Sequence, residues 1–570
     1  MESMKIWLCL LFITLVYGGA AWFTNQPQEV GADVPAGKLK SLSFAPYHDG
    51  YSPIDNTFPL PEHIEGDVRL LADKTHTIRT YSILGGLEPT PGFARQYGVE
   101  MIQGGWLGDG PDGNRKEITA LIQSVNANAD VVKRVIVGNE VLLRNDMTVE
   151  RLVAYIREVK QAIKQPVSYA DVWSIYLKYP QLIKEVDFIT LHILPYWEDE
   201  PVAIENALAH IDKIILQVQA QMRRMGENKP ILIGESGWPA VGRQRGLAVP
   251  SVVNEATFIR GLIRLAEHRQ LDYNIVEAFN QAWKSHHEGV VGANWGLFST
   301  SRQAVFPLTG PVSERPHWPF GFAAAVLLCA VVVAFNLHKL AVLPLPRLAA
   351  LLALLLLMSL CLSHLAEFLW RTSYNTWQHS YAVSMVLANA ALAAGVGRRC
   401  YDILAKQPPA PVLAGGLRLG YLAFMGLALY QSYILAFNGR YISFPVEQFT
   451  IPALGIAALW LCQQLNRPGL SGHKLAFAPL LGMVARHPYD GNIAMLLALG
   501  IPALIFGETA NFMSGGDFIQ AHPQFWQALP VALGYTLYNQ QLQLWLLCVL
   551  SLIVPFLPWR WQTALALPRA

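Results

Sequence analysis

Cysteine is missing from the long central part of this chain. All six cysteines lie outside residues 24–318, and their spacing matches no zinc or thioredoxin motif. So long a segment without cysteine tolerates an oxidising compartment, because no thiols can mispair there. The absence is therefore compatible with export of this segment.

Charged residues are also scarce. They make up 15% of the sequence, against a usual share of roughly a quarter, whereas hydrophobic residues make up 52%. The formal net charge is +2, and basic residues form no cluster with interleaved aromatic residues. This pattern excludes nucleic acid as an expected partner.

Long hydrophobic runs are absent between residue 24 and Pro316 and dominate afterwards. FGFAAAVLLCAVVVAFNL (320–337) and LAALLALLLLMSLCLSHL (348–365) are each long enough to cross about 30 Å of hydrocarbon as a helix. We expect residues 319–570 to form an all-α polytopic membrane domain. Its roughly seven predicted spans lie near 319–337, 348–365, 377–395, 419–437, 449–464, 491–507 and 541–558.

Two further apolar segments allow more than one interpretation. Residues 1–23 carry Lys5 before an apolar run that ends in Trp22 and Phe23. This fits an uncleaved anchor, which the interfacial aromatic pair favours, or a signal peptide that is cleaved near GGAA. FWQALPVALGYTLYN (525–539) is either a further span, which would move the C-terminus to the other side, or an interfacial segment.

The basic residues of alternate loops indicate an orientation. One set of loops contains Lys339, Arg347, Arg398, Arg399, Lys406, Arg418, Arg467, Lys474, Arg486, Arg560 and Arg569. The other set has only Arg371 and Arg440. The positive-inside rule places the first set in the cytoplasm. Residues 24–318 then lie on the opposite side, where an N-terminal export signal would also send them.

Short apolar runs alternate with helical patterns between Leu39 and Pro316. The eight candidate strands are 41–47, 76–82, 99–105, 134–140, 166–172, 186–193, 230–236 and 273–279. Alternation of this kind predicts a parallel sheet, and eight units fit a (β/α)8 TIM barrel. A doubly wound open sheet is the alternative, which the lack of a Gly-rich phosphate loop after the first strand disfavours.

Chemistry in such a barrel takes place at the C-terminal ends of the strands. The residues expected at this mouth are Tyr47, His48, Tyr81, Trp106, Asn139, Glu140, Asp171, Trp173, His192, Tyr196, Glu235, Trp238, Phe279 and Trp283. Aromatic residues also fill barrel cores, and Asp171 could instead cap the helix after the fifth strand. Histidines at such positions are more often structural than catalytic.

Two glutamates on the fourth and seventh strands suggest cleavage of a glycosidic bond. One carboxylic acid would protonate the leaving oxygen, and a second carboxylate about 5–5.5 Å away would attack the sugar. Glu140 and Glu235 can face each other across the barrel, and Asn139 could bind the sugar 2-hydroxyl. We expect burial and the negative neighbour to raise the pKa of the acid. The alternative is a pair of structural, ion-paired acids.

Five motifs resemble glycoside hydrolase family 17, the β-1,3-glucanases and glucanosyltransferases of clan A. They are VGNEV (137–141), ILPYW (193–197), ESGWP (235–239), AFNQAWK (278–284) and WGLF (295–298), within about residues 39–300. The resemblance implies that Glu140 is the acid/base, that Glu235 is the nucleophile and that configuration is retained. It also implies supporting roles for Lys284 and Glu288. The segment VEAFNQAWK (276–284) differs from the plant enzymes and is more similar to the fungal cell-wall and bacterial branch of the family.

A barrel of this family followed by membrane spans resembles bacterial proteins that remodel periplasmic β-(1,3),(1,6)-glucans. The resemblance implies a multi-pass protein of the inner membrane, with a signal anchor or signal peptide at 1–23, a periplasmic barrel at 24–318 and a membrane domain at 319–570. It implies transfer of glucan to a sugar hydroxyl with formation of β-1,6 linkages or branches, with a hydrolytic endo-β-1,3-glucanase as an alternative.

The expected partners are β-glucan and the lipid bilayer, and no metal or cofactor is expected. The spans have almost no charge at mid-depth, which favours an anchor over a transporter. A further alternative remains open, in which the protein binds or exports glucan as the non-catalytic partner of a membrane glucan synthase. The adjacent His286 and His287 with Glu288 make a poor metal-binding set.

Overall fold

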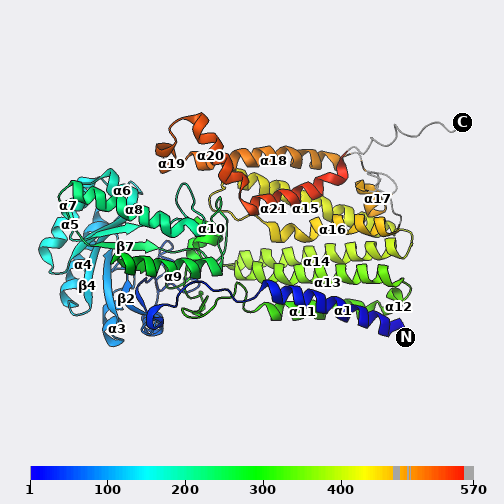
Figure 1. The fold of residues 1–570 in the computed structure, drawn as a ribbon, viewed down its shortest axis with the longest axis horizontal. Helices are drawn as coiled ribbons and strands as arrows, with labels where there is room; N and C mark the ends of the chain where they lie inside the picture. Colours follow the sequence, from blue (N-terminus) through cyan, green and yellow to red (C-terminus); the bar gives the residue numbers. More distant parts are fainter. Residues whose placement is uncertain (1, 467–474, 484–486, 488, 558–570) are drawn as a thin grey trace. The chain divides into compact units, whose positions relative to one another are not determined.

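The computed structural model describes residues 2–466, 475–483, 487 and 489–557. Contacts divide the chain into two compact units (Figure 1). The barrel unit comprises Pro27–Glu314 and Ser514–Ala528, and the helical unit comprises Met1–Gln26, Arg315–Met513 and Leu529–Ala570. Five residues used to predict the orientation lie outside the described residues, namely Arg467, Lys474, Arg486, Arg560 and Arg569.

Eight parallel strands close into a barrel in sequence order. They are β1 (Leu39–Ser43), β2 (Thr75–Arg79), β3 (Glu100–Gly105), β4 (Val132–Asn139), β5 (Val167–Val172), β6 (Ile189–His192), β7 (Ile231–Ser236) and β8 (Asp272–Ile275). Each lies within or beside its predicted range, so the predicted TIM barrel is confirmed. The last strand is shorter than predicted, because the chain leaves the sheet after Ile275.

Helices follow the strands and cover the sheet. They are α2 (Pro61–Leu71), α3 (Thr90–Gln96), α4 (Pro111–Ala127), α5 (Val149–Ala162), α6 (Trp173–Lys178), α7 (Leu182–Glu185), α8 (Ile204–Arg224), α9 (Val252–Arg269) and α10 (Ser285–Gly292), with short 3-10 turns at Pro35–Gly37 and Ala282–Lys284. Thr148 and Ser251 cap α5 and α9, since each side chain accepts a hydrogen bond from a backbone N–H of the first turn.

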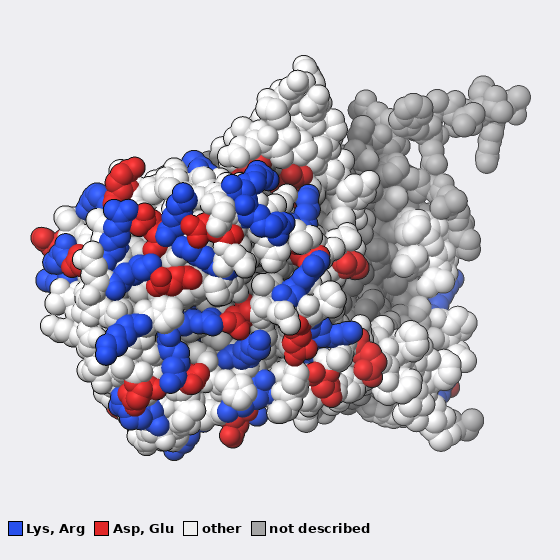
Figure 2. Space-filling view, turned by 60° about the vertical axis from the view of Figure 1, so that its left-hand side comes forward, with Lys and Arg blue, Asp and Glu red and all other residues white. Residues whose placement is uncertain are grey.

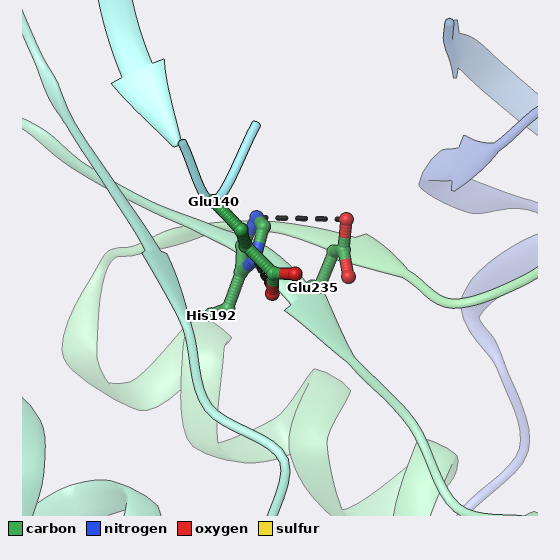
Figure 3. A group of neighbouring side chains, drawn as sticks. All are labelled: Glu140, His192 and Glu235. Carbon is green, nitrogen blue, oxygen red and sulfur yellow. Dashed lines mark hydrogen bonds and ion pairs between the residues drawn. The ribbon is translucent and has the colours of Figure 1, made fainter. Parts of the chain in front are cut away.

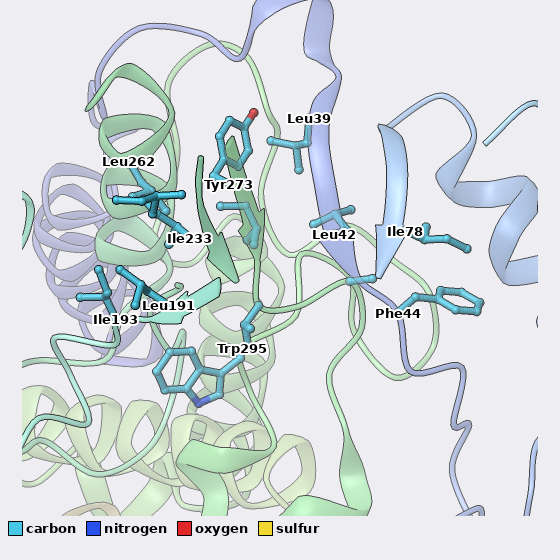
Figure 4. Close-up of a cluster of buried hydrophobic side chains, with 14 of the residues drawn as sticks. Leu39, Leu42, Phe44, Ile78, Leu191, Ile193, Ile233, Leu262, Tyr273 and Trp295 are labelled. Atoms are coloured by element: carbon cyan, nitrogen blue, oxygen red, sulfur yellow. The ribbon is translucent and has the colours of Figure 1, made fainter. Parts of the chain in front are cut away.

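Side chains alternate between the two faces of each strand, so one set points outward to the helices and the other points into the barrel. The outer face packs against the helices, as Leu191 of β6, Ile233 of β7 and Leu262 of α9 do in Figure 4. A separate buried cluster contains Ile102, Ile136, Ala170, Phe188 and Leu232. These residues alternate with the outward ones, so they fill the barrel interior below the mouth.

The helical unit is built from apolar helices. It contains α1 (Glu2–Thr24), α11 (Trp318–Phe335), α12 (Leu337–Leu340), α13 (Leu345–Arg371), α14 (Thr376–Leu404), α15 (Pro411–Phe437), α16 (Val446–Asn466), α17 (Phe477–Leu481), α18 (Asp490–Met513) and α21 (Gln540–Ile553), with a 3-10 turn at Val554–Phe556. Ile6 and Leu10 of α1 are buried in the same hydrophobic cluster as α13 and α14. The predicted helical C-terminal region is therefore confirmed.

Six helices are long and apolar enough to cross a membrane, namely α1, α11, α13, α14, α15 and α18. The span expected near 449–464 coincides with α16, which is not among these six and contains Pro452. The span expected near 541–558 corresponds to α21, which reaches that length and apolarity only together with α20 (Phe525–Leu537), across a bend of 69°. Residue 558 lies outside the described part of the chain.

The segment Ser514–Ala528 belongs to the barrel unit, although it follows α18 in the sequence. It contains α19 (Gly516–Ala521) and the start of α20. The backbone N–H of Asp517 donates to Asp199 Oδ2 at 2.9 Å, and His522 Nε2 lies 3.2 Å from Glu200 Oε2. With 13 residues, α20 alone is only about 20 Å long, too short to cross the hydrocarbon by itself.

Candidate active site

Irregular strand pairing turns Asn139 and Glu235 towards the barrel interior. Val135 and Val137 of β4 face outward, as do Ile231 and Ile233 of β7, so strict alternation would also send Asn139 and Glu235 outward. The register with the neighbouring strand shifts between Ile136 and Asn139, and again between Ile233 and Ser236. An extra residue of this kind moves the following side chains to the other face.

Glu140 follows the end of β4 in an uncommon backbone conformation. Its φ of 53° lies in the left-handed region, which a residue other than glycine adopts at a cost on the order of 1–3 kcal/mol. Its backbone N–H still donates to the carbonyl of Ala170 on β5, at 2.8 Å. Strain of this kind concentrates at functional sites, where a side chain must be aimed in one direction.

The carboxylates of Glu140 and Glu235 meet over His192 (Figure 3). One oxygen of each carboxylate and one ring nitrogen of His192 all lie within 4.8 Å of one another. His192 Nδ1 lies 2.8 Å from Glu140 Oε1, and its Nε2 lies 3.5 Å from Glu235 Oε1. The imidazole is almost completely buried and paired in register with Glu235. It therefore contacts both acids.

Arg79 supplies the positive charge of this cluster. Its Nη1 donates to Glu235 Oε1 at 3.1 Å and to the carbonyl of Gly234 at 2.7 Å. Its Nη2 donates to Asn139 Oδ1 at 2.6 Å and lies 3.5 Å from His192 Nε2. A buried guanidinium with these contacts orients the side chains of Glu235 and Asn139.

The pKa of Glu140 corrects one expectation. Burial raises this pKa, as expected, but the hydrogen bond and charge of His192, together with Arg144 and Arg79, outweigh burial and hold the pKa below its ordinary value. The charge of the neighbouring Glu235 does not determine the direction of this pKa shift, because two guanidinium groups and an imidazole surround Glu140. The free site therefore favours an ionised Glu140.

A second ion pair lies at the same end of the barrel. Lys284 Nζ donates to Glu277 Oε1 at 2.7 Å. Burial raises the pKa of Glu277 to about 7, although the charge and hydrogen bond of Lys284 act in the opposite direction. Burial also raises the pKa of Glu288, which is affected by the charges of Lys284, Glu140 and Glu235. Lys284 and Glu288 therefore lie close enough to the acid pair to influence it.

Several predicted mouth residues keep exposed surface near this cluster. Tyr81 is partly exposed, lies 4.7 Å from the Arg79 guanidinium and donates to Ser43 Oγ at 2.8 Å. Trp106 is 44% exposed, and Arg144 lies 4.5 Å from its ring. Trp283 is partly exposed and packs edge-on against the mostly buried Tyr47, at 6.1 Å.

Three other predicted mouth residues lie behind the surface, which corrects their expected placement. Tyr196, Trp238 and Phe279 have no exposed area and pack in the outer hydrophobic cluster, so they support the wall of the mouth rather than line it. Trp173 is partly buried and donates from Nε1 to Glu198 Oε1 at 3.0 Å. His48 lies beside Asp67 and stacks on His63.

Asp171 is also fully buried. It shares the outward face of Tyr169, not the inward face of Ala170, and it accepts hydrogen bonds from the Tyr169 hydroxyl and from the backbone N–H of Val172. Val172, not Asp171, occupies the N-cap position of α6. Burial raises the pKa of Asp171 to about 6.

Sequence reasoning missed Arg79, Arg144 and Glu277, and it treated His192 as a structural residue. Arg144 donates to the carbonyls of Asn139 and Leu107 and so fixes the backbone beside Glu140. A signal was available for Arg79, because it lies near the C-terminal end of the second candidate strand, where chemistry takes place in such a barrel. Nothing comparable marked Arg144, which lies in the loop after β4.

Glu140, His192 and Glu235 are spaced closely enough to hold a metal ion. However, the Arg79 guanidinium already donates to Glu235 and lies beside His192 in that space. A fixed cation at this point opposes the binding of a second one, so the arrangement suits a hydrogen-bonded acid pair better than a metal site.

Known proteins resemble the barrel unit in sequence. Residues 41–296 match the family model described as BtgE/BtgC glycoside hydrolase domain. A glucan 1,3-beta-glucosidase of Schizosaccharomyces pombe is 26% identical over 273 residues, which cover 45% of this chain and 83% of that protein. A glucan 1,3-beta-glucosidase of Arthroderma benhamiae is 27% identical over 266 residues, which cover 44% and 85%.

Among solved structures, a glycoside hydrolase family 17 beta-1,3-glucanosyltransferase of Rhizomucor miehei is 28% identical. The match covers 48% of this chain and 98% of that chain, with a TM-score of 0.41.

The Glu277–Lys284 pair predicts a pH-dependent loss of stability. Lys284→Met removes the charge and the hydrogen bond that lower the pKa of Glu277, so this pKa should rise further above about 7. A carboxyl whose pKa is raised by folding loses stability as the pH rises from its ordinary pKa through the folded one. We expect little effect at pH 5 and a loss of about 1 kcal/mol at pH 8, measured by denaturant unfolding.

Lys164→Met is the matched control, because Lys164 is exposed on the barrel unit. It should change stability little at either pH. An equal loss at pH 5 and pH 8 for Lys284→Met would contradict the assigned coupling.

Proposed function

We propose, on the premise that residues 41–296 are a glycoside hydrolase domain of the GH17-like β-1,3-glucanase family, that this protein is a retaining glucanosyltransferase acting on β-1,3-glucan. The observation that supports retention is the separation of the two acids. Oxygens of Glu140 and Glu235 lie within 4.8 Å of each other, which suits direct attack and leaves too little room for an intervening water.

In the first step, Glu235 Oε attacks the anomeric carbon of the bound glucan while Glu140 gives its proton to the leaving glycosidic oxygen. The C–O bond to the leaving chain breaks, a glycosyl ester forms on Glu235, and the released chain carries the proton. Arg79 fixes the orientation of Glu235, since it donates to Oε1 at 3.1 Å. Asn139, fixed by the same guanidinium, is positioned to bind the sugar 2-hydroxyl.

In the second step, Glu140 accepts a proton from an acceptor hydroxyl, whose oxygen attacks the anomeric carbon and releases Glu235. The acceptor is a sugar for transfer or water for hydrolysis. The proton that Glu140 accepts in this step then stays in its hydrogen bond with His192 Nδ1, which lies 2.8 Å from Glu140 Oε1, until the next turnover. An ionised Glu140 is the form that the second step requires.

Trp106 is the feature that favours a sugar acceptor. The leaving chain and the acceptor both lie beside the acid/base, and Arg144 ties Trp106 to the backbone of Asn139, next to Glu140. Arg144 covers one part of the ring, and 44% of the residue stays exposed. An aromatic face at this position stacks on a sugar ring and so raises the local concentration of an acceptor that competes with water.

The six apolar helices support attachment to a membrane. We place the barrel on the side away from the basic loops, in the periplasm of a bacterial cell with the helices in the inner membrane, because the positive-inside rule puts those loops in the cytoplasm. Burial of Ile6 and Leu10 against the other helices supports an uncleaved α1, since cleavage would expose that cluster.

The products made from laminari-oligosaccharides test this function. The full chain in mild detergent should yield oligosaccharides longer than the substrate, separated by chromatography and identified by mass spectrometry. Glu235→Gln should lower turnover by at least about a thousandfold, because the nucleophile is lost. Trp106→Ala should shift products from transfer towards hydrolysis while total cleavage falls less.

Trp377→Ala, at an exposed residue of the helical unit, is the matched control for Trp106. If the unmodified chain made only products shorter than the substrate, its function would be hydrolysis and not transfer. Full turnover by Glu235→Gln would contradict the assignment of Glu235 as the nucleophile.

The partnership of His192 with Glu140 predicts a dependence on the leaving group. An aryl laminaribioside with an acidic phenol leaves without protonation, whereas a glucan chain needs the acid. Glu140→Gln should therefore slow glucan cleavage by roughly a hundredfold or more and slow the first step with the aryl substrate far less. His192→Asn should show the same selectivity, on the order of tenfold, in burst-phase kinetics.

His48→Asn should affect both substrates alike and weakly, since His48 lies beside Asp67, away from the acid pair. If His192→Asn slowed both substrates equally, the imidazole would be only a structural support.

A further inference from the structure

A cavity of about 370 Å³ lies in the helical unit, lined by residues of α11 to α14. This volume is in the range of sites that bind small molecules. The cavity is separate from the barrel and its acids, and the proposed glucan chemistry does not use it.

Small residues on one face of α14 create the cavity. Ala390, Ala393, Ala394 and Gly397 follow the spacing i, i+3, i+4 and i+7, so they share one face of the helix. A Cβ atom at Gly397 would come within 3.0 Å of Leu355 Cδ2, so α13 packs closely there. The remaining small side chains fail to fill the space between the helices.

The walls facing these small residues are apolar along most of their length. They include Leu328 and Val332 of α11, together with Leu351, Leu355 and Met358 of α13. Leu328 and Val332 are 41% and 38% exposed, so the cavity is open at the side of the helices rather than sealed. A hydrocarbon chain fits such walls better than a polar solute does.

One end of the cavity is basic. Lys339 of α12 and Arg398 of α14 both line it, beside Tyr401. Arg398 Nε lies 3.1 Å from Asp402 Oδ1 and its guanidinium lies 5.3 Å from the Tyr401 ring. Among the described residues, no carboxylate lies within 4.0 Å of Lys339 Nζ. Two cations therefore face this end with one carboxylate to balance them.

The polarity of the cavity follows the membrane topology expected from the sequence. Lys339 follows the C-terminal end of α11, and Arg398 lies about two turns before the end of α14, so both lie near the helix ends that the positive-inside rule places on the cytoplasmic side. That leaflet carries anionic lipids, and basic pockets between membrane helices on that side bind their headgroups. The apolar walls extend from this end towards the middle of the helices.

We propose that this cavity binds one anionic phospholipid. An acyl chain lies along α11 and α13 against the small face of α14, and the phosphate group lies between Lys339 and Arg398. Lys339 supplies the uncompensated charge, so a lipid with net negative charge binds more tightly than a zwitterionic one of the same chain length.

Native mass spectrometry of the full chain in mild detergent tests this site, with phosphatidylglycerol and phosphatidylcholine of equal chain length added in equal amounts. The unmodified chain should retain one phosphatidylglycerol and little phosphatidylcholine. Lys339→Gln combined with Arg398→Gln should lower retention of phosphatidylglycerol on the order of twentyfold, because each cation near the surface contributes about fivefold.

Lys406→Gln is the control, since Lys406 is exposed on the same predicted side but does not line the cavity. It should leave retention unchanged. Ala393→Leu keeps both cations and fills the cavity, so it should also lose the lipid, while thermal unfolding reports whether each variant is folded. Equal retention of the two lipids, or full retention by folded Ala393→Leu, would overturn the proposal.

Discussion

Two negative charges placed within the reach of a single sugar ring repel each other, and the active-site architecture depends on how this repulsion is offset. At a separation near 5 Å and an effective dielectric constant near 20, the repulsion is on the order of 3 kcal/mol. Arg79 donates to Glu235, and His192 lies between the two carboxylates, so that one full cation and one titratable ring balance them. A deletion of either group would leave an uncompensated charge in a buried site, which costs more than the pair itself gains.

The closed parallel barrel is the second constraint, because it brings strand ends that are distant in sequence to one mouth. The repeating pattern of strands and helices was sufficient to predict this barrel and the eight strand positions. The positions of Glu140 and Glu235 followed from motifs at strand ends. Strict alternation along β7 would place Glu235 on the outer face with Ile231 and Ile233, away from the mouth. Only the register shift turns Glu235 inward. Register shifts depend on pairing between strands, which one sequence does not display.

The same rule explains the side chains that were misplaced. Asp171 obeys the alternation of β5 and therefore faces the helices, whereas Tyr196, Trp238 and Phe279 lie beyond their strands and fold back into the outer cluster. Counting every polar or aromatic residue near a strand end overestimates the open surface. In the helical unit, hydropathy predicted most of the apolar helices, but the bend between α20 and α21 and the barrel contacts of Ser514–Ala528 are tertiary features. They leave no mark in a hydropathy profile.

The proposed mechanism depends on direct attack by Glu235 and on two displacements at the anomeric carbon. Its most direct test is the configuration of the newly formed glycosidic bond, determined by proton NMR of the transfer product at early times. Two displacements at the anomeric carbon predict a β bond, the same configuration as in the β-1,3-glucan substrate. A product with an α bond would mean a single displacement and would contradict the roles assigned to both glutamates.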